Sequence, residues 1–218
     1  MERSVVKFSH CQKEIFCFSV PEDCPACGES LTGRRLEEAP VCLPSPFTNG
    51  HKTSCSFLLT CPQENLDRDI DGQFELHTGI SDTRGAVYNY TQCGVRVDWS
   101  GWERCLHVPL VRPDMFNLQA QWDQYLQHFS RAPMWDPVWH RFDEESHNCF
   151  SFCLRFMNSV LAMQGSACVT GHQFTRSFVL PRVKRASKYT TLCRHIGQRR
   201  FYLTGSRREE EDEEDDCN

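Results

Sequence analysis

Two residues far apart in the sequence, His77 and Cys149, each lie in the local setting that a cysteine nucleophile and its base require. His77 lies in an alternating segment, residues 74–80, which predicts a strand followed by turn residues. Cys149 follows polar residues of N-cap character and opens an apolar segment, so we expect it in the first turn of a helix. The helix dipole and the free backbone N–H groups of that turn lower the pKa of a thiol. A nearby imidazole would complete the activation.

The segments around this pair predict how it is positioned. A helix over residues 149–163 would have almost no polar face, so we expect it to be buried as the hub of the fold. A second strand, residues 86–90, follows the first through the Gly85 turn and is expected to run beside it. Asn89 on that strand could present its amide to His77 and orient the imidazole, as Asn does in Cys-His-Asn proteases.

The order of these elements is a histidine strand, a hairpin, and an Asn-Cys pair that opens an apolar helix. It resembles the permuted papain-like families, including the desumoylating isopeptidases and the lecithin retinol acyltransferase group. The resemblance implies an α+β domain of the permuted papain-like kind that hydrolyses or transfers an acyl or isopeptide bond, with a protein or acyl substrate. It implies Cys149 as nucleophile, His77 as base and Asn89 as the residue that orients the base. Asn89 departs from the acyltransferases, which place a second histidine there.

A resemblance also extends over the whole chain, from His10-Cys11 through residues 36–40 and 47–51 to residues 181–188. There the chain is similar to the makorin-2 opposite-strand protein family, whose name records the position of a gene and implies no activity. Nine histidines and fourteen cysteines can also bring a His beside a Cys by chance, and a buried cysteine often acts as a small hydrophobe. A non-catalytic interaction protein that retains the papain-like scaffold is therefore the alternative to a thiol enzyme.

The amino-terminal residues carry a second motif, the turn Cys24-Pro25-Ala26-Cys27-Gly28, which aims two thiolates at one point. That turn resembles half of a zinc ribbon, and the implied cofactor is a structural zinc ion. Cys11 is a third ligand, and the fourth is either His10 or Cys17. We favour His10, because Cys17 lies in an apolar segment that predicts a strand face. The predicted metal ligands are therefore His10, Cys11, Cys24 and Cys27.

The amino-terminal module, residues 1–38, is therefore expected to be zinc-ribbon-like, although its other half is less regular because Cys11 has no partner three residues on. A segment this short cannot easily build a stable core. The free energy of metal binding would therefore contribute directly to folding of the module. Four protein ligands leave no open coordination position, and the predicted role of the metal is structural. The alternative is a hairpin of reduced cysteines that docks on the main domain.

Composition predicts one main core with a small appendage, because 39% of the 218 residues are hydrophobic and 24% are charged. A proline-rich linker is expected at residues 39–50, the permuted papain-like α+β domain at 51–205, and a disordered acidic tail at 206–218. The start of the chain lacks the apolar segment of a signal peptide, and no segment approaches membrane-spanning length. We therefore expect an intracellular protein, cytoplasmic or nuclear, with its cysteines reduced or metal-bound.

The remaining patterns predict elements around the site. Two further strands are expected at residues 53–60 and 104–110, and helices are expected from Pro113 onward and at residues 181–196. A loop over residues 132–141 should cap the core, with the roof of a substrate groove as the alternative. Residues 176–208 hold ten Lys or Arg and no Asp or Glu, a pattern typical of segments that bind a polyanion such as nucleic acid. We do not expect nucleic acid to bind there, because no aromatic residues interleave with the basic ones and the net charge of the chain is −5.

Overall fold

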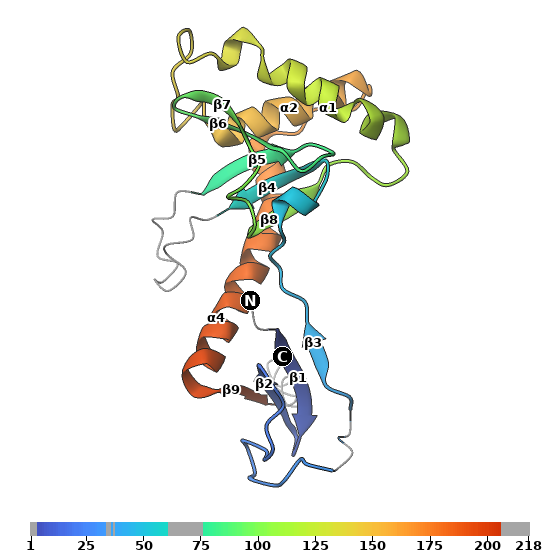
Figure 1. Cartoon of the computed structure of the whole chain (residues 1–218), viewed down its shortest axis with the longest axis vertical. Helices are drawn as coiled ribbons and strands as arrows, with labels where there is room; N and C mark the ends of the chain where they lie inside the picture. The colour runs from blue at the N-terminus through green and yellow to red at the C-terminus, as the bar shows by residue number, and fades with distance from the viewer. Residues whose placement is uncertain (1–3, 34–35, 37, 61–75, 206–218) are drawn as a thin grey trace, which may run out of the picture. The chain divides into compact units, whose positions relative to one another are not determined.

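The computed structural model describes residues 4–33, 36, 38–60 and 76–205. These residues contain helices and two antiparallel sheets, so the predicted α+β class is confirmed (Figure 1). The chain divides into two compact units: Pro46–Ala186 is one, and Met1–Ser45 with Ser187–Asn218 is the other. The predicted acidic tail, residues 206–218, lies outside the described residues.

The sheet of the unit Pro46–Ala186 carries the predicted histidine. In spatial order its strands are β7 (Gly94–Asp98), β6 (Val87–Thr91), β5 (His77–Ser81), β4 (Ser56–Thr60) and β8 (Cys105–Pro109). Neighbouring strands are antiparallel throughout, and Ile80 pairs with Tyr88, so β6 runs beside β5 as predicted. The predicted strands at 53–60 and 104–110 correspond to β4 and β8, whereas β7 was not predicted.

Helices α1 (Phe116–Ser130) and α2 (Cys149–Met163) cover one face of this sheet (Figure 1). The core between helices and sheet is rich in aromatic rings, which come from the strands and from both helices. Helix α2 presents apolar residues around most of its circumference, so most of its sides are packed against this core. Phe156 of α2 lies edge-on to Trp122 of α1, with ring centroids 5.0 Å apart. Each fully buried side chain of this size contributes about 1.5–3 kcal/mol to the free energy of unfolding. The predicted hub helix is therefore confirmed as a buried element.

The segment between α1 and α2 has two different parts. The short 3-10 turn η3 (Pro133–Trp135) inserts Trp135 into the core, where only 2% of its surface is exposed and its ring lies 5.0 Å from that of Phe152. This turn caps the core as predicted. Trp139, four residues later, is 74% exposed. The second part of the segment is therefore available to contact a ligand.

The remaining helices follow α2 along the chain. They are α3 (Gly171–Phe174), the π-helical turn η4 (Thr175–Val179) and α4 (Leu180–Arg199), and a short 3-10 turn, η1 (Gly50–Lys52), precedes β4. The predicted helix at 181–196 is thus present as α4. Val183 and Ala186 of α4 pack against the core described above, whereas the residues from Ser187 onward cluster with the amino-terminal ones.

The second sheet includes segments that the sequence patterns assigned elsewhere. Its strands, in spatial order, are β3 (Val41–Leu43), β1 (Val5–His10), β2 (Lys13–Cys17) and β9 (Phe201–Gly205). Strand β3 lies within the predicted linker, and β9 lies at the end of the predicted main domain. The physical reason is that the β1–β2 hairpin has two open edges, and β3 pairs with one while β9 pairs with the other.

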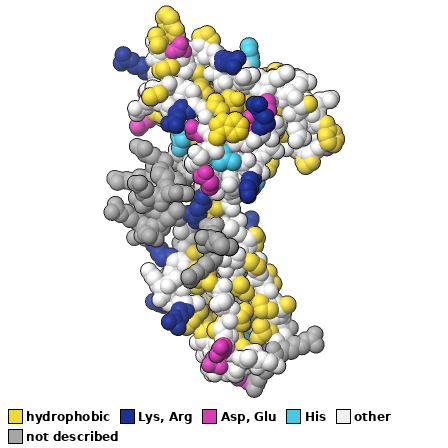
Figure 2. Space-filling model, in the orientation of Figure 1, with side chains coloured by type: hydrophobic (Ala, Val, Ile, Leu, Met, Phe, Trp, Pro, Cys, Tyr) yellow, Lys and Arg dark blue, Asp and Glu magenta, His cyan; other side chains and the backbone are white. Residues whose placement is uncertain are grey.

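On the described part of the face in Figure 2, Lys and Arg side chains lie dispersed among acidic and uncharged ones. Among the described residues, no helix combines the length and the apolarity needed to cross a bilayer.

Two glycines provide a matched test of the turn before β6. Gly85 and Gly101 have nearly equal left-handed φ angles, +94° and +92°. A Cβ on Gly85 would lie 2.4 Å from the backbone oxygen of His51, whereas a Cβ on Gly101 would meet nothing within 4 Å. Both alanine variants should lose about 1–3 kcal/mol through backbone strain. We expect Gly85→Ala to lose clearly more than Gly101→Ala in urea denaturation, and equal losses would contradict the described packing of this turn.

Candidate functional site

Cys149 is the first residue of α2, and its position results from a local capping motif. The Asn148 side chain accepts a hydrogen bond from the backbone N–H of Ser151 at 2.9 Å, and the Asn148 N–H donates to the Ser151 hydroxyl at 2.8 Å. This capping box satisfies two groups that a helix start otherwise leaves open. The predicted N-cap is confirmed, and Cys149 lies in the first turn, where the helix dipole favours a negative charge.

The pKa values of Cys149 and His77 shift in opposite directions. Partial burial of Cys149 would raise its pKa, but hydrogen bonds from His77 and Thr78 together lower it below the ordinary value for a thiol. Burial would likewise lower the pKa of His77, yet hydrogen bonds with Cys149 and Asn89 and the charge of Asp98 raise it. Both shifts favour a thiolate beside an imidazolium.

A chain of directional hydrogen bonds orients the imidazole. The Asn89 amide donates from Nδ2 to Asp98 Oδ2 at 2.7 Å. Since an ionised carboxylate only accepts, this bond turns Asn89 Oδ1 toward His77, whose Nε2 lies 2.9 Å away. His77 Nε2 must then carry the hydrogen, which leaves Nδ1 to exchange a proton with Cys149. Trp102 also donates to Asp98 Oδ2, at 3.3 Å, and its ring centroid lies 5.7 Å from that of His77.

A second chain orients Thr78. Burial raises the pKa of Cys153, so this thiol remains protonated, and its Sγ donates to Thr78 Oγ1 at 3.7 Å. Because Thr78 Oγ1 accepts from Cys153, its own hydroxyl hydrogen is free to donate to Cys149. Thr78 therefore stabilises the Cys149 thiolate through both its hydroxyl and its backbone N–H.

The structure brings together all three residues predicted from the sequence, Cys149, His77 and Asn89, and adds Asp98 and Thr78. Asp98 was not predicted from the sequence, because strand β7 was not predicted. The signal lay in the tight β6–β7 turn, where Thr91 pairs with Gly94. That register places Val87 opposite Asp98, so Asp98 is the diagonal neighbour of Asn89 on the same face of the sheet. No local pattern could have indicated Thr78.

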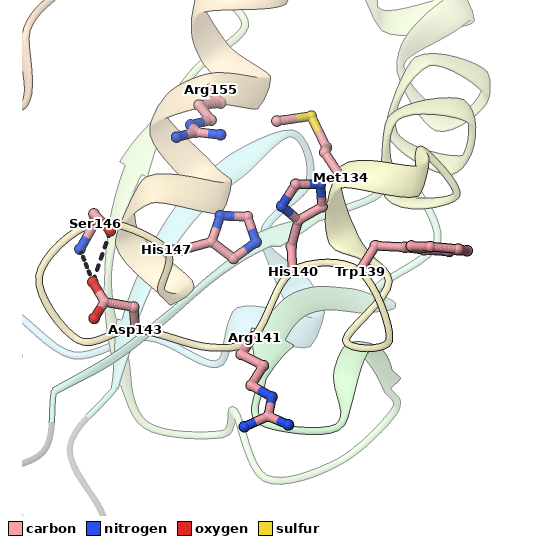
Figure 3. Close-up of a pocket in the computed structure, with 8 residues that line it drawn as sticks. All are labelled: Met134, Trp139, His140, Arg141, Asp143, Ser146, His147 and Arg155. Atoms are coloured by element: carbon pink, nitrogen blue, oxygen red, sulfur yellow. Dashed lines mark hydrogen bonds between the residues drawn. The ribbon is translucent and has the colours of Figure 1, made fainter.

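A pocket of ≈ 520 Å³ opens beside the residues that lead into α2 (Figure 3). We call it the arginine pocket; its lining includes Met134, Trp139, His140, Arg141, His147 and Arg155. The lining is completed by Asp143 and Ser146, which are joined by two hydrogen bonds of 2.7 Å. Figure 3 shows the two histidine rings between Arg155 and Arg141.

The amino-terminal unit holds a separate cluster of four side chains that could bind a metal ion. Its members are His10, Cys11, Cys24 and Cys27, the four predicted ligands, whose ligand atoms lie within 4.8 Å of one another. The Sγ atoms of Cys11 and Cys24 are 3.8 Å apart, and Cys27 Sγ lies 3.5 Å from His10 Nδ1. Cys17, the alternative ligand, is instead buried in the small core of this unit.

The electrostatics of this cluster also suit a cation. Burial and hydrogen bonds with Cys27 and Cys24 raise the pKa of Cys11 to about 12. Burial would also raise the pKa of Cys24, but hydrogen bonds from the backbone N–H groups of Cys27 and Ala26 lower the Cys24 pKa to about 7. Sulfur atoms this close cannot all become negative unless a cation balances them.

Comparisons with known proteins agree with the resemblance over the whole chain. Residues 3–31 match the family model described as DUF4796 N-terminal, and residues 40–196 match the one described as DUF4796 C-terminal. The human MKRN2 opposite strand protein is 45% identical over 202 residues, which cover 93% of this chain and 90% of the human one. The predicted similarity to that protein family is thus confirmed. No solved structure matches the chain.

The role of Asp98 can be tested on the pKa of His77. The Asp98 charge raises that pKa, so Asp98→Asn should lower it. NMR titration of the His77 ring measures the change. Asp114→Asn is the matched control, because Asp114 is 71% exposed and contacts Arg112 instead. An unchanged His77 pKa in Asp98→Asn would show that Asp98 does not act on the imidazole.

Proposed function

We propose that this chain, which belongs to the DUF4796 family, is a thiol-dependent hydrolase or transferase that acts on an acyl or isopeptide bond. One observation carries the proposal: Cys149 opens α2 beside His77, whose Nε2 lies 2.9 Å from Asn89 Oδ1, and the hydrogen bond between Cys149 and His77 shifts both pKa values in the directions that favour an ion pair. Functional sites are where such paired shifts concentrate. Asn89 would be the positioning residue for His77, and Asp98 would orient Asn89.

The proposed reaction has two halves. The Cys149 thiolate attacks the carbonyl carbon, and the His77 imidazolium gives its Nδ1 proton to the leaving nitrogen or oxygen as that bond breaks, which leaves a thioester. Neutral His77 then removes a proton from water or an acceptor nucleophile, which attacks the thioester. Collapse of the adduct releases the acyl product and restores the thiolate and the imidazolium. Backbone N–H groups in the first turn of α2 would stabilise the oxyanion.

The permuted papain-like assignment is part of the same proposal. It is supported by the chain order, because the strand that holds His77 precedes the helix that Cys149 opens. It is also supported by Asn89, which lies on the strand that neighbours β5. In Cys-His-Asn proteases an amide orients the imidazole in this way.

We also propose that the cluster in the amino-terminal unit binds structural zinc. A tetrahedral zinc site has bonds of about 2.3 Å to sulfur and about 2.0 Å to nitrogen, which imply separations of about 3.8 Å between sulfurs and about 3.5 Å from sulfur to nitrogen. The observed Cys11–Cys24 and Cys27–His10 distances, 3.8 Å and 3.5 Å, fit these values.

The surroundings of the cluster support the same assignment. His10 Nδ1 would be the ligand atom, since it faces Cys27, and His10 Nε2 lies 3.8 Å from Glu29 Oε2. That separation is an electrostatic contact rather than a hydrogen bond, and it places a carboxylate on the side of the ring where zinc-bound histidines commonly have one. Four protein ligands leave no open position, so this zinc would stabilise the unit and take no part in chemistry. Both sites need reduced cysteines, so the proposal includes an intracellular location.

Alkylation of Cys149 tests the activated thiol. An ordinary thiol, with a pKa near 8.5, is almost wholly protonated at pH 6. The lowered pKa of Cys149 should give it a larger thiolate fraction at pH 6 than an ordinary thiol has, so iodoacetamide should label it faster than the exposed cysteines Cys93 and Cys168. His77→Gln removes the bond that lowers this pKa. The variant should slow labelling at pH 6 by about tenfold for each unit of pKa restored.

Mass spectrometry can follow the peptide of each cysteine, so Cys93 and Cys168 serve as internal references in every sample. Their rates should be the same in His77→Gln. A Cys149 that reacts no faster than these references, or that ignores His77→Gln in folded protein, would contradict the enzyme proposal. The alternative, a non-catalytic interaction protein, would then be the better interpretation.

Metal analysis tests the zinc proposal. We expect about one zinc ion per chain in protein purified without chelator, since the four ligands suffice for one tetrahedral site. Cys24→Ser should lose the ion and lower the melting temperature of the amino-terminal unit. Cys42→Ser is the matched control, because Cys42 is an exposed cysteine of the same unit outside the cluster. Folded wild-type protein without zinc would refute the assignment.

A further inference from the structure

The arginine pocket gathers positive charge next to the proposed nucleophile. Arg141 and Arg155 both line it, together with His140 and His147 (Figure 3). Its single acidic lining residue, Asp143, already accepts two hydrogen bonds from Ser146. Asp143 therefore braces the loop, and the two guanidinium groups keep a net positive charge in the pocket.

Contacts among the lining residues hold three of the basic groups, His140, His147 and Arg155, close together, and Arg141 lines the pocket beyond the two histidines. The His147 ring stacks on Trp135 at a centroid distance of 4.9 Å, and the Arg155 guanidinium lies 5.8 Å from the same indole. The rings of His140 and His147 are 5.8 Å apart. Burial, followed by the charges of Arg155 and His140, lowers the pKa of His147. A bound anion would relieve the repulsion among these groups.

The chain itself links the pocket to the thiol. His147 lines the pocket and precedes Cys149 by two residues, with the N-cap Asn148 between them. Two residues span at most about 7 Å of extended chain, so the backbone of a pocket-lining residue lies within that distance of the Cys149 backbone.

We propose that the arginine pocket binds the carboxylate of an acidic side chain in a peptide substrate of Cys149. The inference rests on the proposed function, and it names the substrate class. Guanidinium groups bind carboxylates through paired, charge-assisted hydrogen bonds, and two are present. Met134 and the exposed indole of Trp139 offer apolar surface to the aliphatic part of a glutamate side chain. A pocket of ≈ 520 Å³ has room for such a residue.

Reactive peptides of matched shape provide the test. Chloroacetyl-Gly-Glu-amide and chloroacetyl-Gly-Gln-amide differ only in the side-chain carboxylate, and both alkylate a thiolate with loss of chloride. Their two residues span about 7 Å when extended, which matches the largest separation of the His147 and Cys149 backbones. We expect the Glu probe to label Cys149 about threefold to tenfold faster than the Gln probe, as expected for a charge-assisted contact in a partly exposed pocket. The ratio of the Glu-probe rate to the Gln-probe rate should decrease as the salt concentration increases, because salt screens the charges.

Variants of the full-length protein assign the effect to the pocket. In Arg141→Gln, and further in the Arg141→Gln/Arg155→Gln double variant, the ratio of the two rates should fall toward one. The single variant avoids loss of the Arg155 contact with Trp135. Arg131→Gln is the matched control, because Arg131 is an exposed arginine of the same unit that does not line the pocket, and its ratio should equal that of wild type.

The outcomes separate this inference from the proposed function. A ratio near one in wild type, or a ratio that survives the double variant, overturns the arginine pocket as a carboxylate site. If the Gln probe still labels Cys149 rapidly at pH 6 and depends on His77, the proposed function stands without it. Slow labelling by both probes counts against the proposed function instead.

Binding without reaction gives an independent measurement. In Cys149→Ala, acetyl-Gly-Glu-amide should shift the NMR signals of the His140 and His147 rings, and acetyl-Gly-Gln-amide should not. Equal shifts, or none, overturn the carboxylate assignment. A phosphoserine peptide that binds more tightly than the Glu peptide would identify phosphate as the preferred anion and would also overturn it.

Discussion

A helix that is apolar on most sides has to be enclosed by protein, and α2 meets this requirement against β5 and β6. Its buried residues are Phe152, Cys153, Phe156, Met157 and Val160. This burial places the start of α2 against β5, where Thr78 bonds to Cys149 and Cys153. The position of the thiol is therefore a consequence of core packing, and the capping box at Asn148 determines the residue at which the helix begins.

Packing brings the groups together, but hydrogen bonds determine the chemistry. The carboxylate of Asp98 can only accept, so it determines the orientation of Asn89, which in turn determines the His77 nitrogen that carries a hydrogen. Bonds to charged groups contribute about 1.5–3 kcal/mol each, less than the aromatic core as a whole. Their value lies in direction: a core can hold an imidazole near a thiol, but it cannot select the tautomer.

Two groups of the described cysteines differ in what surrounds the sulfur. At the start of α2 one partly buried thiol receives hydrogen bonds from an imidazole and a threonine, which lower its pKa and leave the sulfur free to react. In the amino-terminal unit three sulfurs lie around one point, and the backbone N–H groups of Cys27 and Ala26 lower the pKa of Cys24. The first arrangement favours a nucleophile, and the second favours a ligand set. Neighbouring groups, rather than the residue type, decide between them.

The sequence by itself determined the local features of this protein. The N-cap at Asn148, the apolar face of α2, the strand at His77 and the Cys-Pro-x-Cys turn depend on residues within a few positions of one another, so local patterns were sufficient. The nearness of Asn89 to His77 followed from one short hairpin. Only the tertiary structure decided the places of Asp98, Thr78 and β9. Strand register and core packing join residues that are distant in sequence, and no local pattern specifies such contacts.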